Sequence, residues 1–166
     1  MKKEFFLAGM LLCLVVLSVQ AARVDTVMVK SRSMGKEVQV VYVVPDKAEG
    51  DRAQACPVVY LLHGYGGNAK TWINIKPQLP SIADEKGIIF VCPDGKNSWY
   101  WDSPVNSSYR YETFVSSELI AYTDSHYKTI AAPQGRAITG LSMGGHGALW
   151  NAFRHKDVFG AAGSTS

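Results

Sequence analysis

The sequence carries little excess charge and few signatures of a special composition. Its 17 Lys and Arg against 14 Asp and Glu give a formal net charge of +3 over 166 residues. So small and evenly scattered a charge argues against a nucleic-acid-binding protein. We find no repeat, low-complexity tract or internal linker, and no metal cluster or nucleotide loop that would imply a cofactor. Apolar residues make up 47%, which excludes a disordered chain and favours one globular domain.

The sequence also lacks an apolar run of the roughly 20 residues that a membrane-spanning helix needs. Residues 1–21 instead combine a basic start, a shorter apolar stretch and small residues before Ala22, which predicts a secretory signal peptide cleaved after Ala21. An uncleaved anchor is the alternative, whereas the bulky Leu12 before Cys13 argues against a lipoprotein. Cleavage leaves 15 basic and 13 acidic residues, hence +2. We therefore expect an exported protein, periplasmic or extracellular, with no stable membrane span.

Cysteines are scarce, and the mature chain keeps only Cys56 and Cys92. An exported protein is permitted a disulfide. Cys56, however, begins its apolar run and Cys92 ends its own, so in parallel strands they would lie at opposite ends. We predict two buried free thiols.

Short apolar runs alternate with helical patterns along the chain. Runs without polar alternation indicate strands covered on both faces. The sequence therefore predicts an α/β fold, a mostly parallel sheet with helices on both faces. The expected strands are 24–30, 38–44, 57–62, 88–92 and 137–139, and the expected helices are 72–75, 82–86, 111–127 and 143–155.

Gly140-Leu141-Ser142-Met143-Gly144 fits the G-x-S-x-G nucleophile elbow, in which a serine takes a strained conformation between a strand and a helix. Five residues can match by chance, but here an apolar strand precedes the motif and a helix-compatible segment follows it. The context predicts that Ser142 is a nucleophile.

A second motif, Leu61-Leu62-His63-Gly64-Tyr65-Gly66-Gly67, leads from an apolar strand into a glycine-rich loop. Backbone N–H groups of such a loop can face a developing oxyanion, although an ordinary glycine turn is the alternative. His63 precedes the turn, and we expect it to hold the loop rather than act in catalysis.

Four segments in order resemble the putative-esterase family of α/β-hydrolases, which includes S-formylglutathione hydrolases, feruloyl and tributyrin esterases and the mycolyltransferases of the antigen 85 group. The resemblance runs from about Val24 to Ser166. The segments are LLHGYGGN (61–68), CPDGKNSWYWDSP (92–104), YETFVSSEL (111–119) and GLSMGGHGAL (140–149).

The resemblance implies an α/β-hydrolase fold with Ser142 as nucleophile and the backbone N–H groups of Met143 and Tyr65 as oxyanion donors. It also implies that the 97–102 loop borders the substrate, with Trp99, Trp101 and Asp102 offering surfaces to a sugar or phenolic ring. Aromatic residues packed onto the domain are the alternative. Glu112 and Glu118, in or near a helix, are expected to be surface residues or structural partners.

The rest of a catalytic triad is harder to find. In α/β-hydrolases the order is serine, acid, histidine, and after Ser142 the chain offers only His146, His155 and Asp157. His146 lies one helical turn beyond the serine, and the other two lie about 20 Å away along the helix. His126, Asp94 and Asp102 precede the serine. We expect residues 22–166 to be the N-terminal portion of a longer esterase domain, poorly soluble and nearly inactive alone.

Three functional hypotheses follow. The first is a serine carboxylic ester hydrolase that acts through an acyl-serine on acetyl or feruloyl esters of polysaccharides or small molecules. The second is acyl transfer to a sugar alcohol, like the mycolyltransferases. The third is a truncated, non-catalytic carbohydrate-binding relic that keeps the aromatic loop.

Overall fold

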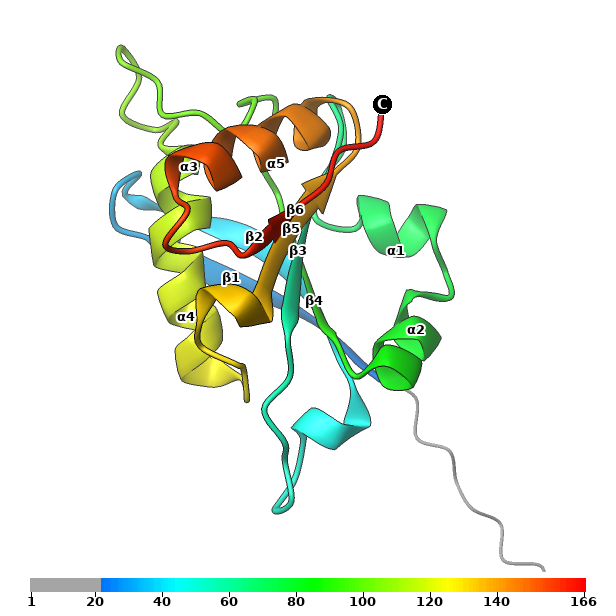
Figure 1. The fold of residues 1–166 in the computed structure, drawn as a ribbon. Coiled ribbons are helices and arrows are strands. Elements are labelled where there is room, and N and C mark those ends of the chain that lie inside the picture. The colour runs from blue at the N-terminus through cyan, green and yellow to red at the C-terminus, as the bar shows by residue number, and fades with distance from the viewer. Residues whose placement is uncertain (1–21) are drawn as a thin grey trace, which may run out of the picture.

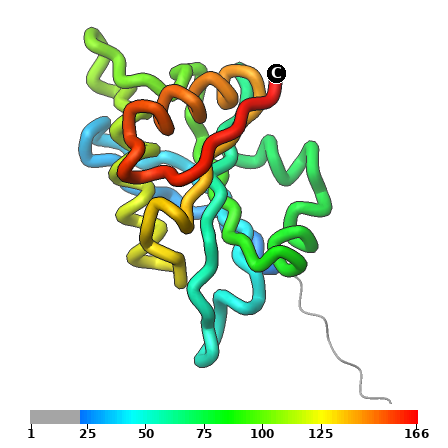
Figure 2. The backbone as a smooth tube through the Cα atoms, viewed as in Figure 1, coloured from blue at the N-terminus to red at the C-terminus, as the bar shows by residue number. Residues whose placement is uncertain are grey.

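The computed structural model describes residues 22–166 (Figures 1 and 2). The predicted signal peptide, residues 1–21, lies outside the described residues. Within them, no helix is both long and apolar enough to cross a membrane.

One mixed sheet of six strands forms the centre of the molecule, in the order β1-β2-β4-β3-β5-β6. The pairs β1·β2 and β2·β4 are antiparallel, and the others are parallel. All five predicted strands are confirmed. The strands are β1 Arg23–Ser31, β2 Lys36–Val44, β3 Val58–Leu62, β4 Ile89–Pro93, β5 Arg136–Gly140 and β6 Ala161–Ala162.

The helices also follow the predicted segments, with one irregularity. The expected 111–127 helix contains a π-helical turn, Phe114–Glu118, between α3 and α4. Gly87, in the left-handed region at φ 62°, ends α2. The helices are α1 Thr71–Ile75, α2 Leu79–Lys86, α3 Tyr111–Thr113, α4 Leu119–His126 and α5 Met143–Arg154.

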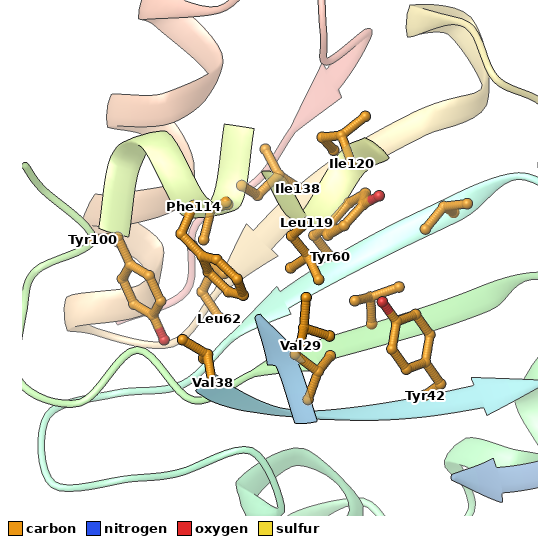
Figure 3. Packing of buried hydrophobic residues seen from close by; sticks show 14 of the residues in the cluster. Val29, Val38, Tyr42, Tyr60, Leu62, Tyr100, Phe114, Leu119, Ile120 and Ile138 are labelled. Atoms are coloured by element: carbon orange, nitrogen blue, oxygen red, sulfur yellow. The ribbon is translucent and has the colours of Figure 1, made fainter. Parts of the chain in front are cut away.

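Each face of the sheet is covered by its own helices and has its own apolar core. Figure 3 shows strand residues Tyr60, Leu62 and Ile138 packed with Phe114 and Leu119 from the α3–α4 segment. The opposite core joins strand residues to α2. It includes Val41, Val43, Leu61, Phe90, Leu79 and Ala83. Helices on both faces confirm the α/β prediction.

The connections between strands create a topological switch point between β3 and β5. The β3–β4 connection carries α1 and α2 on one face, while the β5–β6 connection carries α5 on the other (Figure 1). Right-handed crossovers in opposite directions along a sheet require this arrangement. The neighbouring strands β3 and β5, paired at Leu62 and Gly140, therefore send their chains to opposite sides. Ligands of open α/β sheets bind at such a point.

Cys56 and Cys92 are buried, and neither forms a disulfide with another described residue. The prediction of two buried thiols is confirmed. Burial raises the pKa of both thiols above the ordinary value.

Candidate active site

Ser142 lies between the end of β5 and the start of α5. Its backbone has φ 53° and ψ −114°, a region that a residue with a Cβ rarely occupies. The Ser142 N–H donates to the Thr165 carbonyl at 2.7 Å, which ties the turn to the segment after β6. Figure 2 shows this last segment running beside β5. The strained turn leaves the Ser142 side chain exposed at the edge of the sheet.

The glycines of the elbow are required by close backbone approach. A Cβ on Gly144 would lie under 3.0 Å from the Leu62 carbonyl, and a Cβ on Gly140 would meet Gly144 itself. The atoms in the way are main-chain atoms, which cannot rotate aside. The two glycines therefore let α5 begin directly against β3 and β5.

The glycine-rich loop after β3 reaches the same place. A Cβ built on Gly64 would lie 3.7 Å from the Ser142 Cβ and 3.3 Å from the Leu141 carbonyl oxygen. The N–H groups of Tyr65 and Met143 donate hydrogen bonds to no residue within 22–166. Two free backbone donors therefore lie on the segments that flank the serine, the arrangement an oxyanion hole uses.

His63 holds this loop in place. Its Nε2 accepts the Gly95 N–H at 2.9 Å, so the ring proton is on Nδ1 and donates to the Gly64 carbonyl at 2.7 Å. The side chain is buried. Both ring nitrogens are occupied, which agrees with a structural role and leaves neither free to act on Ser142.

The loop after β4 is strained in three places. Lys96, Trp99 and Tyr100 all have φ between 48° and 59°. The Tyr100 ring is fully buried, and its hydroxyl donates to the His63 carbonyl at 3.2 Å. Burial raises the pKa of Tyr100 well above its ordinary value, so this hydroxyl stays protonated. Packing of Tyr100 thus holds the strained loop against the glycine-rich loop after β3.

Asn97 makes a second link between the two loops. Its side-chain oxygen accepts the Gly66 N–H at 2.8 Å. The aromatic loop and the glycine-rich loop are therefore one connected unit, with Tyr65 next to the contact.

The two tryptophans on either side of Tyr100 are partly exposed and are not buried against the domain. Trp99 and Trp101 are each 43% exposed. Their ring centroids lie 5.5 and 5.3 Å from that of His146, and Trp101 also contacts Trp150 at 5.4 Å. Because His146 lies one turn beyond Ser142 on α5, the aromatic surface begins about 6 Å along the helix from the serine.

Asp102 is placed differently from the tryptophans. Its two carboxylate oxygens accept the Thr113 N–H at 3.0 Å and the Thr113 hydroxyl at 2.5 Å. The side chain also lines a cavity in the loop. Both carboxylate oxygens are thus already bonded to Thr113, the last residue of α3.

Glu112 is buried and serves as a structural partner of α5. It accepts hydrogen bonds from Trp150 Nε1 at 2.8 Å, Arg154 Nε at 2.7 Å and His155 Nε2 at 2.9 Å. Burial would raise the pKa of Glu112, but these hydrogen bonds outweigh burial and lower it below the ordinary value. Glu118 similarly accepts bonds from Ser31 and Ser33.

No side chain of residues 22–166 forms a hydrogen bond with the Ser142 hydroxyl. His155 is bound to Glu112 and His126 to the Tyr122 carbonyl, while His146 faces the tryptophans. The described residues thus bring together a serine and two amide donors, without a base or an acid in contact.

Sequence reasoning did not single out Tyr100, Asn97 or the contact of His146 with the tryptophans. No local pattern marks them, because each contact joins residues 31 to 47 positions apart in the chain. Three consecutive aromatics, Trp99, Tyr100 and Trp101, were the only visible signal, and only burial separates the middle one from its neighbours.

A strand–serine–helix elbow that faces a glycine-rich loop at the switch point of an α/β sheet defines the α/β-hydrolase class. Comparison with known proteins agrees with this class. The chain belongs to the family described as "Putative esterase", whose model matches residues 31–166.

Individual relatives cover the same region. The chain is 34% identical over 150 residues to the MPT51/MPB51 antigen of Mycobacterium bovis, which is 89% of this chain and 46% of that protein. It is 34% identical over 101 residues to an acetyl esterase of Caldicellulosiruptor saccharolyticus, 61% of this chain and 37% of that protein. A solved ferulic acid esterase matches with a TM-score of 0.73 and 30% identity, over 85% of this chain and 58% of that one. The chain spans less than half the length of these two curated relatives.

Proposed function

We propose that the protein is a serine carboxylic ester hydrolase in which Ser142 forms an acyl-enzyme. The observation that supports this most directly is the strained, exposed serine between two segments with unbonded amide donors, Tyr65 and Met143. Ser142 Oγ attacks the ester carbonyl, and the carbonyl oxygen becomes an oxyanion held by the two N–H groups. The alkoxide leaves with a proton, and water then releases the acid from Ser142.

The proton on Ser142 Oγ must pass to a base within about 3 Å. None of the histidines of residues 22–166 occupies such a position, and we propose that the acid and histidine follow Ser142 in the full reading frame. The substrates we propose are acetyl or feruloyl esters of polysaccharides. Export through the predicted signal peptide would bring the enzyme to such substrates.

The test is to express the full reading frame that contains this chain and assay p-nitrophenyl acetate and methyl ferulate. Ser142→Ala is expected to reduce kcat at least about a thousandfold, as loss of a serine nucleophile does, while circular dichroism stays unchanged. Undiminished hydrolysis by the variant would overturn the proposal. Asn68→Ala, exposed at the far end of the same loop, is the control and is expected to retain activity.

Acyl transfer to a sugar is the second candidate, because the exposed tryptophans beside Ser142 offer an acceptor a place to compete with water. Chromatography of products formed with and without a sugar acceptor separates the two. An acylated sugar as main product would favour transfer. A protein without Ser142-dependent turnover would be the non-catalytic relic.

A further inference from the structure

Tyr65 lies in a tight turn of the glycine-rich loop. The Gly67 N–H donates to the Gly64 carbonyl at 3.0 Å, which closes a four-residue turn over 64–67. Gly66 has φ 76°, whereas Tyr65 does not have a positive φ. A positive φ at only the third residue identifies a type II turn. The turn type sets the directions of the two peptide groups that flank Tyr65.

The peptide before Tyr65 is held by its carbonyl. The Gly64 carbonyl accepts both the Gly67 N–H and, at 2.7 Å, the Nδ1–H of the buried His63. A trans peptide group is planar, and its C=O and N–H point in opposite directions. Because the Gly64 carbonyl points toward His63, the Tyr65 N–H points away from it. The two bonds therefore fix the direction of the Tyr65 N–H.

The peptide after Tyr65 is held from another loop. Its N–H, that of Gly66, donates to Asn97 Oδ1 at 2.8 Å. Type I and type II turns differ by roughly a half rotation of this central peptide. Glycine permits both orientations at little cost, so the backbone alone does not select one. Asn97 stabilises type II, because rotation would turn the Tyr65 carbonyl oxygen toward the Asn97 oxygen.

Asn97 is itself held in a strained turn. The Ser98 N–H donates to the Gly95 carbonyl at 3.3 Å, and Lys96, the second residue of this turn, has φ 48°. A lysine keeps such a φ only where neighbouring groups enforce it. The carboxylate of the buried Asp94 accepts the Lys96 N–H at 2.9 Å and a bond from Lys96 Nζ at 2.7 Å. Strain maintained directly before Asn97 supports a function for the position of its side chain.

We propose that Asn97 is a positioning residue for the oxyanion hole, which holds the turn that carries the Tyr65 N–H. It thereby couples that donor to the loop that bears Trp99 and Trp101. When the ester carbon becomes tetrahedral, its oxygen takes negative charge, and a donor already held in the right direction stabilises that charge without reorganisation. This inference rests on the proposed function, since it requires an oxyanion formed at Ser142.

The test is to compare the hydrolysis of p-nitrophenyl acetate by the full reading frame with and without Asn97→Ala. We expect kcat to fall at least about fivefold, because a misdirected donor stabilises the transition state less. KM is expected to change less than about twofold, since the neutral ester gains little from an oxyanion donor. A trifluoromethyl ketone, which adds to Ser142 as a charged hemiketal, should lose affinity by the same factor as kcat/KM.

Asn106→Ala is the matched control. Asn106 is also an exposed asparagine of the loop between β4 and α3, and its Oδ1 accepts the Ser108 N–H at 3.0 Å, a bond within its own loop. Its removal is expected to change kcat less than about twofold.

A smaller fall in kcat for Asn97→Ala, an equal fall for Asn106→Ala, or a loss that appears only in KM would overturn the proposal. If Ser142→Ala abolishes hydrolysis and Asn97→Ala does not affect it, this inference fails alone. If Ser142→Ala leaves hydrolysis undiminished, the proposed function fails and this inference fails with it.

Discussion

At the residue scale, the site depends on two glycines whose lack of a Cβ allows close backbone packing. Gly140 and Gly144 have no Cβ, and so α5 starts within contact of the Leu62 carbonyl. Ser142, by contrast, has a Cβ and takes φ 53° all the same. Backbone strain at such a residue persists only where its surroundings enforce it. Here the enforcing contacts are the Thr165 carbonyl and the glycine packing.

Gly144→Ala is expected to destabilise the protein by about 1 to 3 kcal/mol, because the added methyl group overlaps main-chain atoms that cannot move aside. Urea unfolding followed by circular dichroism measures the loss. Gly50→Ala is the control. Its new Cβ meets nothing within 4 Å, and only the strain of φ 70°, about 1 kcal/mol, remains. Equal losses in both variants would contradict the steric explanation.

Tyr100→Phe keeps the ring that fills the space beside Gly95 and Gly147 and removes the hydroxyl that donates to the His63 carbonyl. We expect a loss of about 1 kcal/mol, the net value of one buried hydrogen bond. Tyr100→Ala is expected to lose about 3 to 5 kcal/mol, since it also creates a cavity. A loss in the Phe variant as large as that in the Ala variant would show that the hydroxyl, not the ring, anchors the loop.

At the scale of elements, α5 is held at both ends. Its first turn abuts β3 through glycine, and its last turns hold Glu112 of α3 through Trp150, Arg154 and His155. Arg154 also lies over the Trp150 ring at 5.0 Å. Ser142 precedes the first turn of α5, and Trp150 further along the helix contacts Trp101. Because Glu112 of α3 bonds Trp150, α3 and α5 together position the aromatic surface.

The lowered pKa of Glu112 predicts that the stability of the protein depends on pH. Its pKa is lower in the folded protein than its ordinary value of 4.5, so the folded state binds the proton less tightly than the unfolded state. Its contribution is therefore complete above about pH 4.5 and is lost as the pH falls through the lower folded-state value. Glu112→Gln is expected to be less stable at pH 7 by about 1 to 3 kcal/mol, and the difference should shrink on acidification.

Urea midpoints of both proteins between neutral and acid pH measure this difference. Glu37→Gln is the control, because Glu37 is exposed and accepts no side-chain hydrogen bond from residues 22–166. A Glu112→Gln difference that stays constant with pH would contradict the assignment.

At the scale of the whole molecule, the topology of the sheet positions Ser142 and the glycine-rich loop. β3 and β5 are neighbours whose chains leave toward opposite faces. His63, His126 and His155 are each held by partners other than Ser142.

The 166-residue chain by itself is expected to hydrolyse p-nitrophenyl acetate near the background rate, with no more than the residual catalysis that an oxyanion hole and binding provide without a base. Ser142→Ala should then make little difference in this chain, in contrast to the full reading frame. Turnover by the chain at rates typical of esterases, abolished by Ser142→Ala, would show that one of its own histidines reaches the serine.

Most of the elements could be predicted because each rests on a local pattern. Apolar runs such as 88–92 predicted β4, the helical pattern of 82–86 predicted α2, and G-x-S-x-G predicted the turn at Ser142. The π-helical turn in 111–127 could not be predicted, because helical spacing alone does not distinguish it from a regular helix. The bonds of the Asp102 carboxylate to Thr113 could not be predicted either, because no motif joins the two residues, and the predicted role of Asp102 beside the substrate stays a prediction.

The sequence by itself determined the order of strands and helices, the turn at Ser142 and the glycine-rich loop, because turns and periodicity are properties of neighbouring residues. The tertiary structure alone decided which aromatics stay exposed, which donors remain unbonded and where the loop cavity opens. Those properties depend on which distant segments exclude water from one another. Tyr100 is buried and Trp99 and Trp101 are exposed because of the groups that pack against the loop, not because of their own chemistry.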